Sequence, residues 1–381
     1  MRATLSLVTA FLLGSHSLAA QAQYTATFIE TSKVWGSVVA DFNRDGHDDF
    51  FITGHDQSDR IWYWTKKGYK PAAQALPWVD RHDCDAADVN LDGLLDVYCA
   101  LGAGKGIGVN VNELWMQLPT GEFSAASGFG AEDPYGRGRR PVFLDFNHDG
   151  FPDLYVTNDA TPRPDGMLNE NRLFINQAGA GFAPADTIAS GDKGYQCAVK
   201  GDFNQDGWDD LMVCYENGPG HLFLNNKAGN FTEVASPAPG VEWKDAKLVD
   251  MNGDGREDLV LVTLTNLFQI WINTGASPYF TSPAYSDLLP AKGVSVAVGD
   301  FNRDGRKDVY VVLQDLKCLT TTVDRAPDIL YTARTTAGFD KTQLPQSLRG
   351  CGHMADVVDG DKILLENGGM DFKGPNYLLS W

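Results

Sequence analysis

The sequence is poor in basic side chains and lacks the short motifs of common catalytic and phosphate-binding sites. Its 381 residues include 31 Lys and Arg against 50 Asp and Glu, a formal net charge of −19. Such an acidic chain repels a phosphate backbone, which argues against nucleic acid as a partner. The sequence has no G-x-x-x-x-G-K-[ST], H-E-x-x-H, G-x-S-x-G or C-x-x-C motif. A phosphate cradle, a zinc protease site or a hydrolytic triad therefore cannot be assigned.

Long apolar runs are also scarce. One run, from Leu5 to Leu13, follows the single basic residue Arg2 and precedes Ala20-Gln21-Ala22. This pattern predicts a signal peptide over residues 1–22, cleaved after Ala22, and a secreted or periplasmic chain over 23–381. A retained membrane anchor is the alternative, but the run is shorter than the ~20 apolar residues of a spanning helix. No later run is long enough to span a membrane.

The most prominent feature that is present is a repeated acidic motif. The first copy reads D-F-N-R-D-G-H-D-D from Asp41. Similar copies begin at Asp88, Asp145, Asp202, Asp250 and Asp300, and a degenerate seventh copy begins at Asp356. The period is about 50 residues, which is typical of a repeat architecture.

Each acidic loop lies between two short β-like runs, and a hairpin follows it. Four antiparallel strands per repeat predict an all-β fold, a seven-bladed β-propeller. The seventh repeat has room for three strands before the chain stops, whereas residues 24–31 read like a fourth strand. We therefore expect the N-terminal strand to complete the last blade and to close the ring.

The repeats resemble the FG-GAP and VCBS repeats of integrin-α-type propellers and many secreted bacterial proteins. The resemblance covers residues 24–381 and rests on the D-F-N-x-D-G-x-x-D-L loop, the N-x-L-F-x-N strand and the G-x-F turn. It implies calcium-binding loops, in which aspartates at positions one, five and nine and the asparagine at position three donate side-chain oxygens. The corresponding residues are Asp41, Asn43, Asp45, Asp49, Asp88, Asn90, Asp92, Asp96, Asp145, Asn147, Asp149, Asp153, Asp202, Asn204, Asp206, Asp210, Asp250, Asn252, Asp254, Asp258, Asp300, Asn302, Asp304 and Asp308.

The loop chemistry favours the same ion. Carboxylate and amide oxygens with glycine at the sixth position suit Ca²⁺, and the lack of nitrogen and sulfur ligands argues against zinc. The alternative is a set of metal-free Asp/Asn/Gly turns, in which three aspartates per loop would repel one another. We expect about six calcium sites and none in the seventh loop.

The cysteine positions predict disulfides, which an oxidising compartment would allow. Cys84 and Cys99 flank the second loop on adjacent strands, and Cys197 and Cys214 flank the fourth. A one-residue offset between these pairs should place the two bridges on opposite faces of their blades. Cys318 and Cys351 form the expected third pair; buried free thiols are the alternative.

A second cluster is expected at the axial mouth opposite the acidic loops. Basic and aromatic residues precede each first aspartate by about one strand length and should converge there. The candidate ligand-binding residues are Trp35, Arg81, Arg139, Arg140, Tyr195, Trp243, Lys244 and Arg349. The long connections at 100–112, 123–141, 158–170 and 314–328 should overhang the same side. The alternative is that the basic residues pair with acids such as Asp80 and Asp245 and that the tryptophans are core.

Two functions fit these features. The first is a calcium-stabilised binding module that recognises a glycan or an extracellular protein through this mouth. The second is a lyase on anionic polysaccharide, in which Arg139 or Arg140 neutralises a uronate and His82 or Tyr195 acts as base or acid. The missing acid/base constellation favours the binding module.

Overall fold

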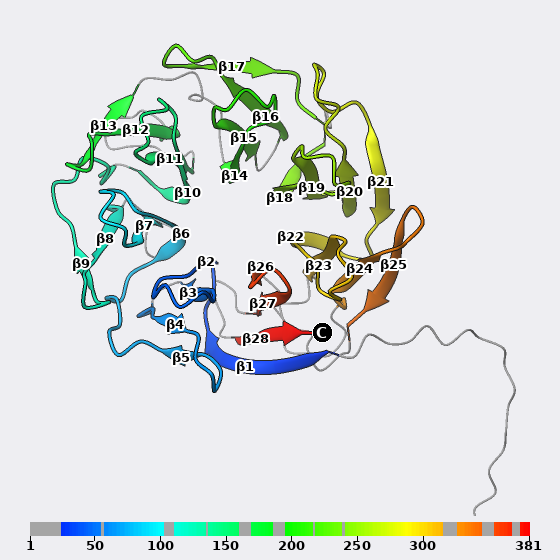
Figure 1. Cartoon of the computed structure of the whole chain (residues 1–381), viewed down its shortest axis with the longest axis horizontal. Helices are drawn as coiled ribbons and strands as arrows, with labels where there is room; N and C mark the ends of the chain where they lie inside the picture. Colours follow the sequence, from blue (N-terminus) through cyan, green and yellow to red (C-terminus); the bar gives the residue numbers. More distant parts are fainter. Residues whose placement is uncertain are drawn as a thin grey trace, which may run out of the picture.

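The computed structural model shows a ring of seven β-sheets (Figure 1). It describes residues 24–54, 57–102, 110–134, 136–159, 169–185, 195–215, 218–237, 241–314, 326–344, 354–367 and 374–381. All regular secondary structure in these ranges is strand. They contain no helix long and apolar enough to cross a membrane. The predicted signal peptide lies outside the described residues.

Each sheet is one blade of four antiparallel strands, which confirms the predicted seven-bladed propeller. Blade 1 has β2 (Gly36–Ala40), β3 (Asp49–Thr53), β4 (Ile61–Tyr63) and β5 (Lys70–Pro71), and blade 2 has β6 (Arg81–Ala87), β7 (Asp96–Leu101), β8 (Glu113–Gln117) and β9 (Phe123–Ala125). Blade 3 has β10 (Gly138–Leu144), β11 (Asp153–Asn158), β12 (Arg172–Asn176) and β13 (Phe182–Ala185), and blade 4 has β14 (Tyr195–Gly201), β15 (Asp210–Tyr215), β16 (Gly218–Asn225) and β17 (Phe231–Val234). Blade 5 has β18 (Trp243–Val249), β19 (Asp258–Thr263), β20 (Leu267–Trp271) and β21 (Pro283–Leu288), and blade 6 has β22 (Lys292–Gly299), β23 (Asp308–Gln314), β24 (Ile329–Ala333) and β25 (Phe339–Gln343).

Blade 7 joins the two ends of the chain. Its strands are β26 (Met354–Val358), β27 (Lys362–Glu366), β28 (Gly374–Ser380) and, at the outer edge, β1 (Thr25–Ser32). The pairing of β1 with β28 runs from Thr25 opposite Ser380 to Ser32 opposite Gly374. The N-terminal strand therefore closes the ring, as the sequence predicts.

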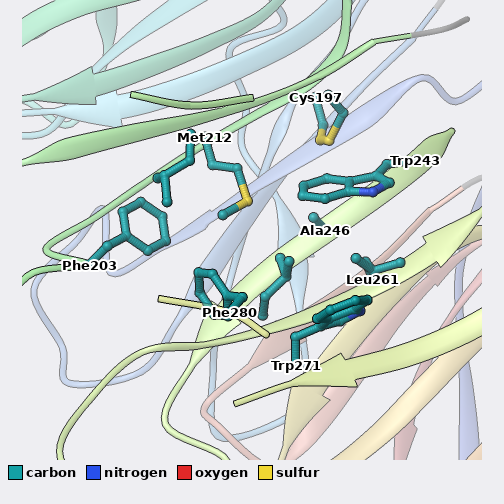
Figure 2. Close-up of a cluster of buried hydrophobic side chains, with 11 residues drawn as sticks. Cys197, Phe203, Met212, Trp243, Ala246, Leu261, Trp271 and Phe280 are labelled. Atoms are coloured by element: carbon teal, nitrogen blue, oxygen red, sulfur yellow. A yellow bond between two sulfur atoms is a disulfide. The ribbon is translucent and has the colours of Figure 1, made fainter. Parts of the chain in front are cut away.

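The core lies between the blades. The second strand of a blade is buried along its whole length, as in β3 and β19, because neighbouring blades cover both of its faces. One such cluster packs Cys197 and Met212 of blade 4 against Trp243 and Leu261 of blade 5 (Figure 2). Burial of apolar surface between blades stabilises the ring by roughly 25 cal/mol per Å² of apolar area.

Two of the predicted disulfides are present. Cys84 is bonded to Cys99, and Cys197 is bonded to Cys214. The first bridge packs with blade 1 and the second with blade 5. The two bridges thus lie on opposite faces of their blades, as the offset predicts. Cys318 and Cys351 lie outside the described residues.

The topology separates two rims of the ring. The first strand of each blade faces the centre (Figure 1) and ends in an acidic loop. We call the rim that carries these loops the Asp rim. The second strand of each blade ends, and its third strand begins, at the other rim, which we call the distal rim. Strand alternation thus places the acidic loops and the starts of the first strands at opposite ends of the axis.

Candidate functional site

The six intact acidic loops of the Asp rim are held by the same internal hydrogen bonds. In the first loop, Asp45 N donates to Asp41 Oδ1 at 3.0 Å and to Asn43 Oδ1 at 2.9 Å. Gly46 N donates to Asp41 Oδ2 at 2.9 Å, and His47 N donates to Asp45 Oδ1 at 3.0 Å. Gly46 has a φ of +84° with open space around it, so the turn requires glycine for its backbone conformation.

The ninth aspartate anchors each loop to its blade. All six of these carboxyl groups are 0% exposed. Asp49, for example, accepts from Asn43 N and from Trp64 N at 3.2 and 2.7 Å. Burial raises the pKa of Asp49, Asp96, Asp153 and Asp308 to about 6, and nearby loop carboxylates add to this rise. Burial likewise raises the pKa of Asp210 to about 7. Each loop therefore concentrates negative charge around a buried acid.

The donor set of these loops fits a hard cation, although the loops are not preassembled. In the described ranges, no three Asp, Glu, His or Cys side chains converge as a ready metal site. Instead, polar hydrogens approach the fifth aspartate. Asn90 Nδ2 donates to Asp92 Oδ2 at 3.0 Å, and Arg256 pairs with Asp254. Oxygen ligands whose charge is countered only by such contacts match the preferences of calcium.

The seventh loop has lost the register of the motif, and cationic side chains reach its carboxylates, as Arg256 and Arg306 do in the fifth and sixth loops. Lys362 pairs with Asp359, and Arg303 Nε donates to Asp361 Oδ2 at 2.6 Å. The hydrogen bond and charge of Lys362 lower the pKa of Asp359 against the effect of burial. Asp48 N of the first loop donates to Asp359 Oδ1 at 2.8 Å, and Asp359 N donates to Asp48 Oδ2 at 2.6 Å. Protein cations and backbone contacts thus stabilise this loop.

On the distal rim, an aromatic and charged cluster joins blades 1 to 3. The partly exposed Trp35 stacks on His82 with ring centroids 4.7 Å apart, and the Arg139 guanidinium lies 5.5 Å from the Trp35 ring. Arg139 and Arg137 both pair with Asp159, at 2.7 and 3.2 Å. We call these five residues the Trp35 cluster. The strand starts bring Trp35, His82 and Arg139 together, as the sequence predicts.

His82 is poorly placed to exchange a proton with a polymer. It is 1% exposed, and its Nδ1 lies 2.9 Å from the Gly138 carbonyl oxygen. Its Nε2 lies 3.7 Å from the buried Asp80. The backbone of Gly102 packs directly against the His82 ring, because a Cβ at this position would lie only 2.1 Å from His82 Nε2. The geometry makes His82 a packed support for Trp35.

Two predicted ligand-binding residues are buried, and their assignment is wrong. Trp243 is 0% exposed and belongs to the core between blades 4 and 5. Arg81 is also 0% exposed and pairs with Asp59 at 2.9 Å and Glu113 at 2.8 Å. The register that places a residue at the strand start does not decide whether its side chain faces the axis or the next blade.

Arg140 belongs to a network of ion pairs deeper in the axis. It pairs with Asp83 at 2.8 Å and with Asp245 at 3.3 Å, so it spans from blade 3 to blades 2 and 5. Lys247 of blade 5 pairs with Asp356 of blade 7 at 3.1 Å. Beside these pairs lies a cavity of about 310 Å³ lined partly by Ser37 and Lys200. Arg140 therefore follows the alternative interpretation of the sequence, in which basic residues of the mouth pair with acids such as Asp245.

The other predicted mouth residues are less defined. Lys244 is partly exposed beside Asp245. Arg349 lies outside the described residues, as does the side chain of Tyr195. Sequence reasoning missed Asp159 and Lys247, although each follows from a visible signal. Asp159 directly follows β11, and Lys247 lies on the same face of β18 as Asp245 under the two-residue period.

Comparisons with known proteins agree with the fold. The family model described as FG-GAP-like repeat matches residues 41–99, 88–156, 202–261 and 250–311, which together exceed half of the chain. A T-cell immunomodulatory protein homolog of Plasmodium yoelii yoelii is 24% identical over 200 residues, 50% of this chain and 22% of that protein. A homolog of the same name from Plasmodium falciparum (isolate 3D7) is 26% identical over 136 residues, 29% of this chain and 18% of that protein. This chain spans about a fifth of these curated relatives.

Solved propellers share the architecture at low sequence identity. BBS1N, crystallised in complex with ARL6DN and soaked with lead, has a TM-score of 0.58 at 10% identity, with 94% of this chain and 96% of that chain covered. Saccharomyces cerevisiae Sqt1 has a TM-score of 0.54 at 11% identity, with 93% and 87% covered. These likenesses concern the fold alone.

Proposed function

The chain belongs to the FG-GAP-like repeat family, and from this premise we propose that it is an exported, calcium-stabilised binding module. Two disulfides support an oxidising compartment. The similarity to T-cell immunomodulatory protein homologs and the use of a similar ring in the BBS1N–ARL6DN complex support a binding role. Fold alone does not define a ligand, so the proposal rests on the two rims.

The proposed calcium ligands are the side chains at positions one, three, five and nine of the six intact loops. The observation that carries the proposal is the repeated geometry of the six loops, in which the carboxylate and amide oxygens of positions one, three and five turn inward beside a fully buried ninth aspartate. A bound Ca²⁺ would neutralise these carboxylates and link the loop to its blade. The role proposed for the ion is structural.

Melting experiments test this role. We expect calcium to raise the Tm of the purified protein, since an ion that binds only the folded state stabilises it by mass action. Asp149→Asn should lower the number of bound ions by one. The matched control is Asp361→Asn in the seventh loop, whose carboxylate accepts a hydrogen bond from Arg303. It should leave the number of bound ions unchanged. An identical Tm in calcium and in chelator would contradict the proposal.

The ligand is proposed to bind on the distal rim, at the Trp35 cluster. An aromatic face beside paired guanidinium and carboxylate groups offers stacking together with hydrogen-bond donors and acceptors. Because Asp159 partners both arginines, we expect recognition through shape and hydrogen bonds more than through net positive charge. A glycan hydroxyl array and an extracellular protein surface both provide such partners.

Binding assays on a glycan array and with candidate protein partners separate these ligands. Trp35→Ala and Arg139→Ala should weaken binding at least tenfold without a change in Tm beyond a few degrees. Leu91→Ala, on the Asp rim, is the control and should bind normally. Unsaturated products from a uronate polysaccharide, followed by ultraviolet absorbance, would instead support the lyase hypothesis.

A further inference from the structure

Buried amide side chains at the ends of third strands connect each blade to the preceding acidic loop. They occur in blades 2 to 5, and each donates to the carbonyl of the second residue of that loop. The bonds are Gln117 Nε2 to Phe42 O at 3.0 Å, Asn176 Nδ2 to Val89 O at 2.8 Å, Asn225 Nδ2 to Phe146 O at 2.8 Å and Asn273 Nδ2 to Phe203 O at 2.9 Å. We call these four side chains the strand-end amides. They are at most 4% exposed.

The same four residues also hold the ninth aspartate of their own blade through their backbone N–H groups. These bonds are Gln117 N to Asp96 Oδ1 at 2.8 Å, Asn176 N to Asp153 Oδ1 at 2.7 Å, Asn225 N to Asp210 Oδ1 at 2.7 Å and Asn273 N to Asp258 Oδ1 at 2.9 Å. Each residue therefore contacts two consecutive loops at once.

The accepting residue completes the connection. Phe146 receives the Asn225 amide on its carbonyl oxygen, and its own N–H donates to Asp153 Oδ2 at 3.0 Å. Phe203 is bonded in the same way between Asn273 and Asp210. In loops 2 to 4 a continuous chain of hydrogen bonds thus runs from one ninth aspartate to the next. In loop 1, Phe42 N donates to Ala40 O instead, and Asn43 N makes the bond to Asp49 Oδ2.

This chain does not extend to the sixth loop. Ala333 occupies the equivalent position in blade 6, where its N–H donates to Asp308 Oδ1 at 2.8 Å. Its methyl side chain has no donor to offer the loop of blade 5. Blade 6 therefore retains the anchor of its own loop without an amide link to its neighbour.

We propose that the strand-end amides are positioning residues that couple cation binding among loops 1 to 5 and leave loop 6 uncoupled. This inference rests on the proposed function, in which these loops bind calcium. An ion that orders one loop fixes the carbonyl of its second residue, and the amide then orients the next ninth aspartate. The next loop is then already partly ordered, so a smaller loss of conformational entropy opposes binding of the next ion, which gives positive cooperativity.

Calcium titration of the full mature chain by calorimetry tests the coupling. Asn225→Leu removes the link between loops 3 and 4 at similar volume, whereas Asn225→Gln restores a donor of the kind Gln117 supplies in blade 2. We expect Asn225→Leu to retain the stoichiometry but to bind with a lower Hill coefficient and roughly fivefold weaker midpoint, within the usual range of allosteric coupling. Asn225→Gln should recover most of both. If the Asn225 amide only stabilises the fold and does not couple the loops, Asn225→Leu would lower the Tm and leave the Hill coefficient unchanged.

Substitutions of single loop aspartates provide a second measurement that does not depend on the Asn225 variants folding. Asp206→Asn in loop 4 and Asp304→Asn in loop 6 should each remove one ion. Only the loop 4 change should weaken the remaining sites.

The two proposals fail in different ways. Equal effects of the loop 4 and loop 6 changes, or a Hill coefficient of 1 in the unaltered protein, would overturn the coupling while calcium binding stands. A calorimetric titration that detects no binding of calcium to the unaltered protein would overturn the proposed function itself.

Discussion

At the scale of single residues, the acidic loops contain a strained backbone position. The fourth residue of each intact loop has a positive φ, and in five loops it is not glycine. Leu91 has a φ of +57° and is 52% exposed, so its side chain gains little from burial. A left-handed conformation costs a non-glycine residue about 1–2 kcal/mol. The loops therefore fold against a local cost.

Leu91→Gly should relieve this cost. The substitution also lowers the free energy of unfolding by about 0.4–1 kcal/mol, because glycine gives the unfolded chain more conformational freedom. We therefore expect a net increase in the free energy of unfolding of about 0.5–1 kcal/mol. Denaturant unfolding in calcium-free buffer measures it. Leu118→Gly is the matched control, because Leu118 is 38% exposed without a positive φ, and it should lose stability. A loss for both variants would contradict the strain argument.

Glu366 is a second residue with an energetic cost in the folded state, here of desolvation, since it is 0% exposed and neither carboxyl oxygen has a hydrogen bond of normal geometry within the described ranges. Burial raises its pKa well above the usual value, and the charges of Asp356, Asp83 and Glu30 add to the rise, whereas contact with Ser37 opposes it. The folded protein therefore holds a proton that the unfolded chain releases above about pH 4.3. Its contribution to stability is full below that pH and declines as the pH rises towards the folded-state pKa.

Glu366→Gln removes this titration while it keeps the side-chain shape. We expect the Tm difference between variant and wild type to shift in favour of the variant between pH 5 and pH 8, by a few degrees. Calorimetric melts across this range give the result. A difference independent of pH would show that Glu366 does not titrate on unfolding.

At the scale of elements, the closing strand β1 shows how much a sequence pattern can specify. The strand-like pattern of residues 24–31 and the presence of only three strands in the seventh repeat correctly predict that β1 completes the last blade, because a blade without a fourth strand leaves an open edge. Ile29 and Ser32 are buried, whereas Phe28 is 56% exposed beside Tyr377. The strand thus closes the ring mainly through its backbone ladder with β28.

Deletion of residues 24–32 should destabilise the ring and expose β28. We expect a loss of at least ~3 kcal/mol, since each of several ladder hydrogen bonds contributes about 0.5–1.5 kcal/mol. Light scattering should show self-association through the new edge. Phe28→Ser, which keeps the ladder, should scatter light as the wild type does and melt within a few degrees of it if the backbone pairing is what matters.

At the scale of the whole molecule, ion pairs across the axis connect blades that are not neighbours. Arg140 reaches from blade 3 to Asp245 of blade 5, and Lys247 reaches from blade 5 to Asp356 of blade 7. Nearby carboxylates, Asp83 first among them, raise the pKa of Arg140 against the effect of burial. The axis therefore contains a charge-compensated network that holds the ring together.

Arg140→Met should leave Asp83 and Asp245 buried without their cation. Loss of one partner from a buried pair costs about 3–5 kcal/mol, and we expect the lower end because the Arg140 side chain is 16% exposed. Arg334→Met is the control, since its pair with Asp340 is largely exposed and should contribute at most ~1 kcal/mol. Equal losses in urea unfolding would refute a special role for the axis.

The sequence by itself determined the seven repeats, the closing strand, the two disulfides between facing strands and the geometry of the acidic turns. These features depend on local spacing, on the two-residue period of strands and on residues such as Gly46 whose backbone conformation is intrinsic. Only the tertiary structure decided which residues at the starts of the first strands pack into the core and which remain accessible to solvent. Trp35 directly precedes the first strand of blade 1 and Trp243 is the first residue of the first strand of blade 5, yet Trp243 is core and Trp35 is partly exposed. Packing between blades, and which basic side chain an acid such as Asp159 or Asp245 meets, depend on residues distant in sequence, so only the closed ring decides them.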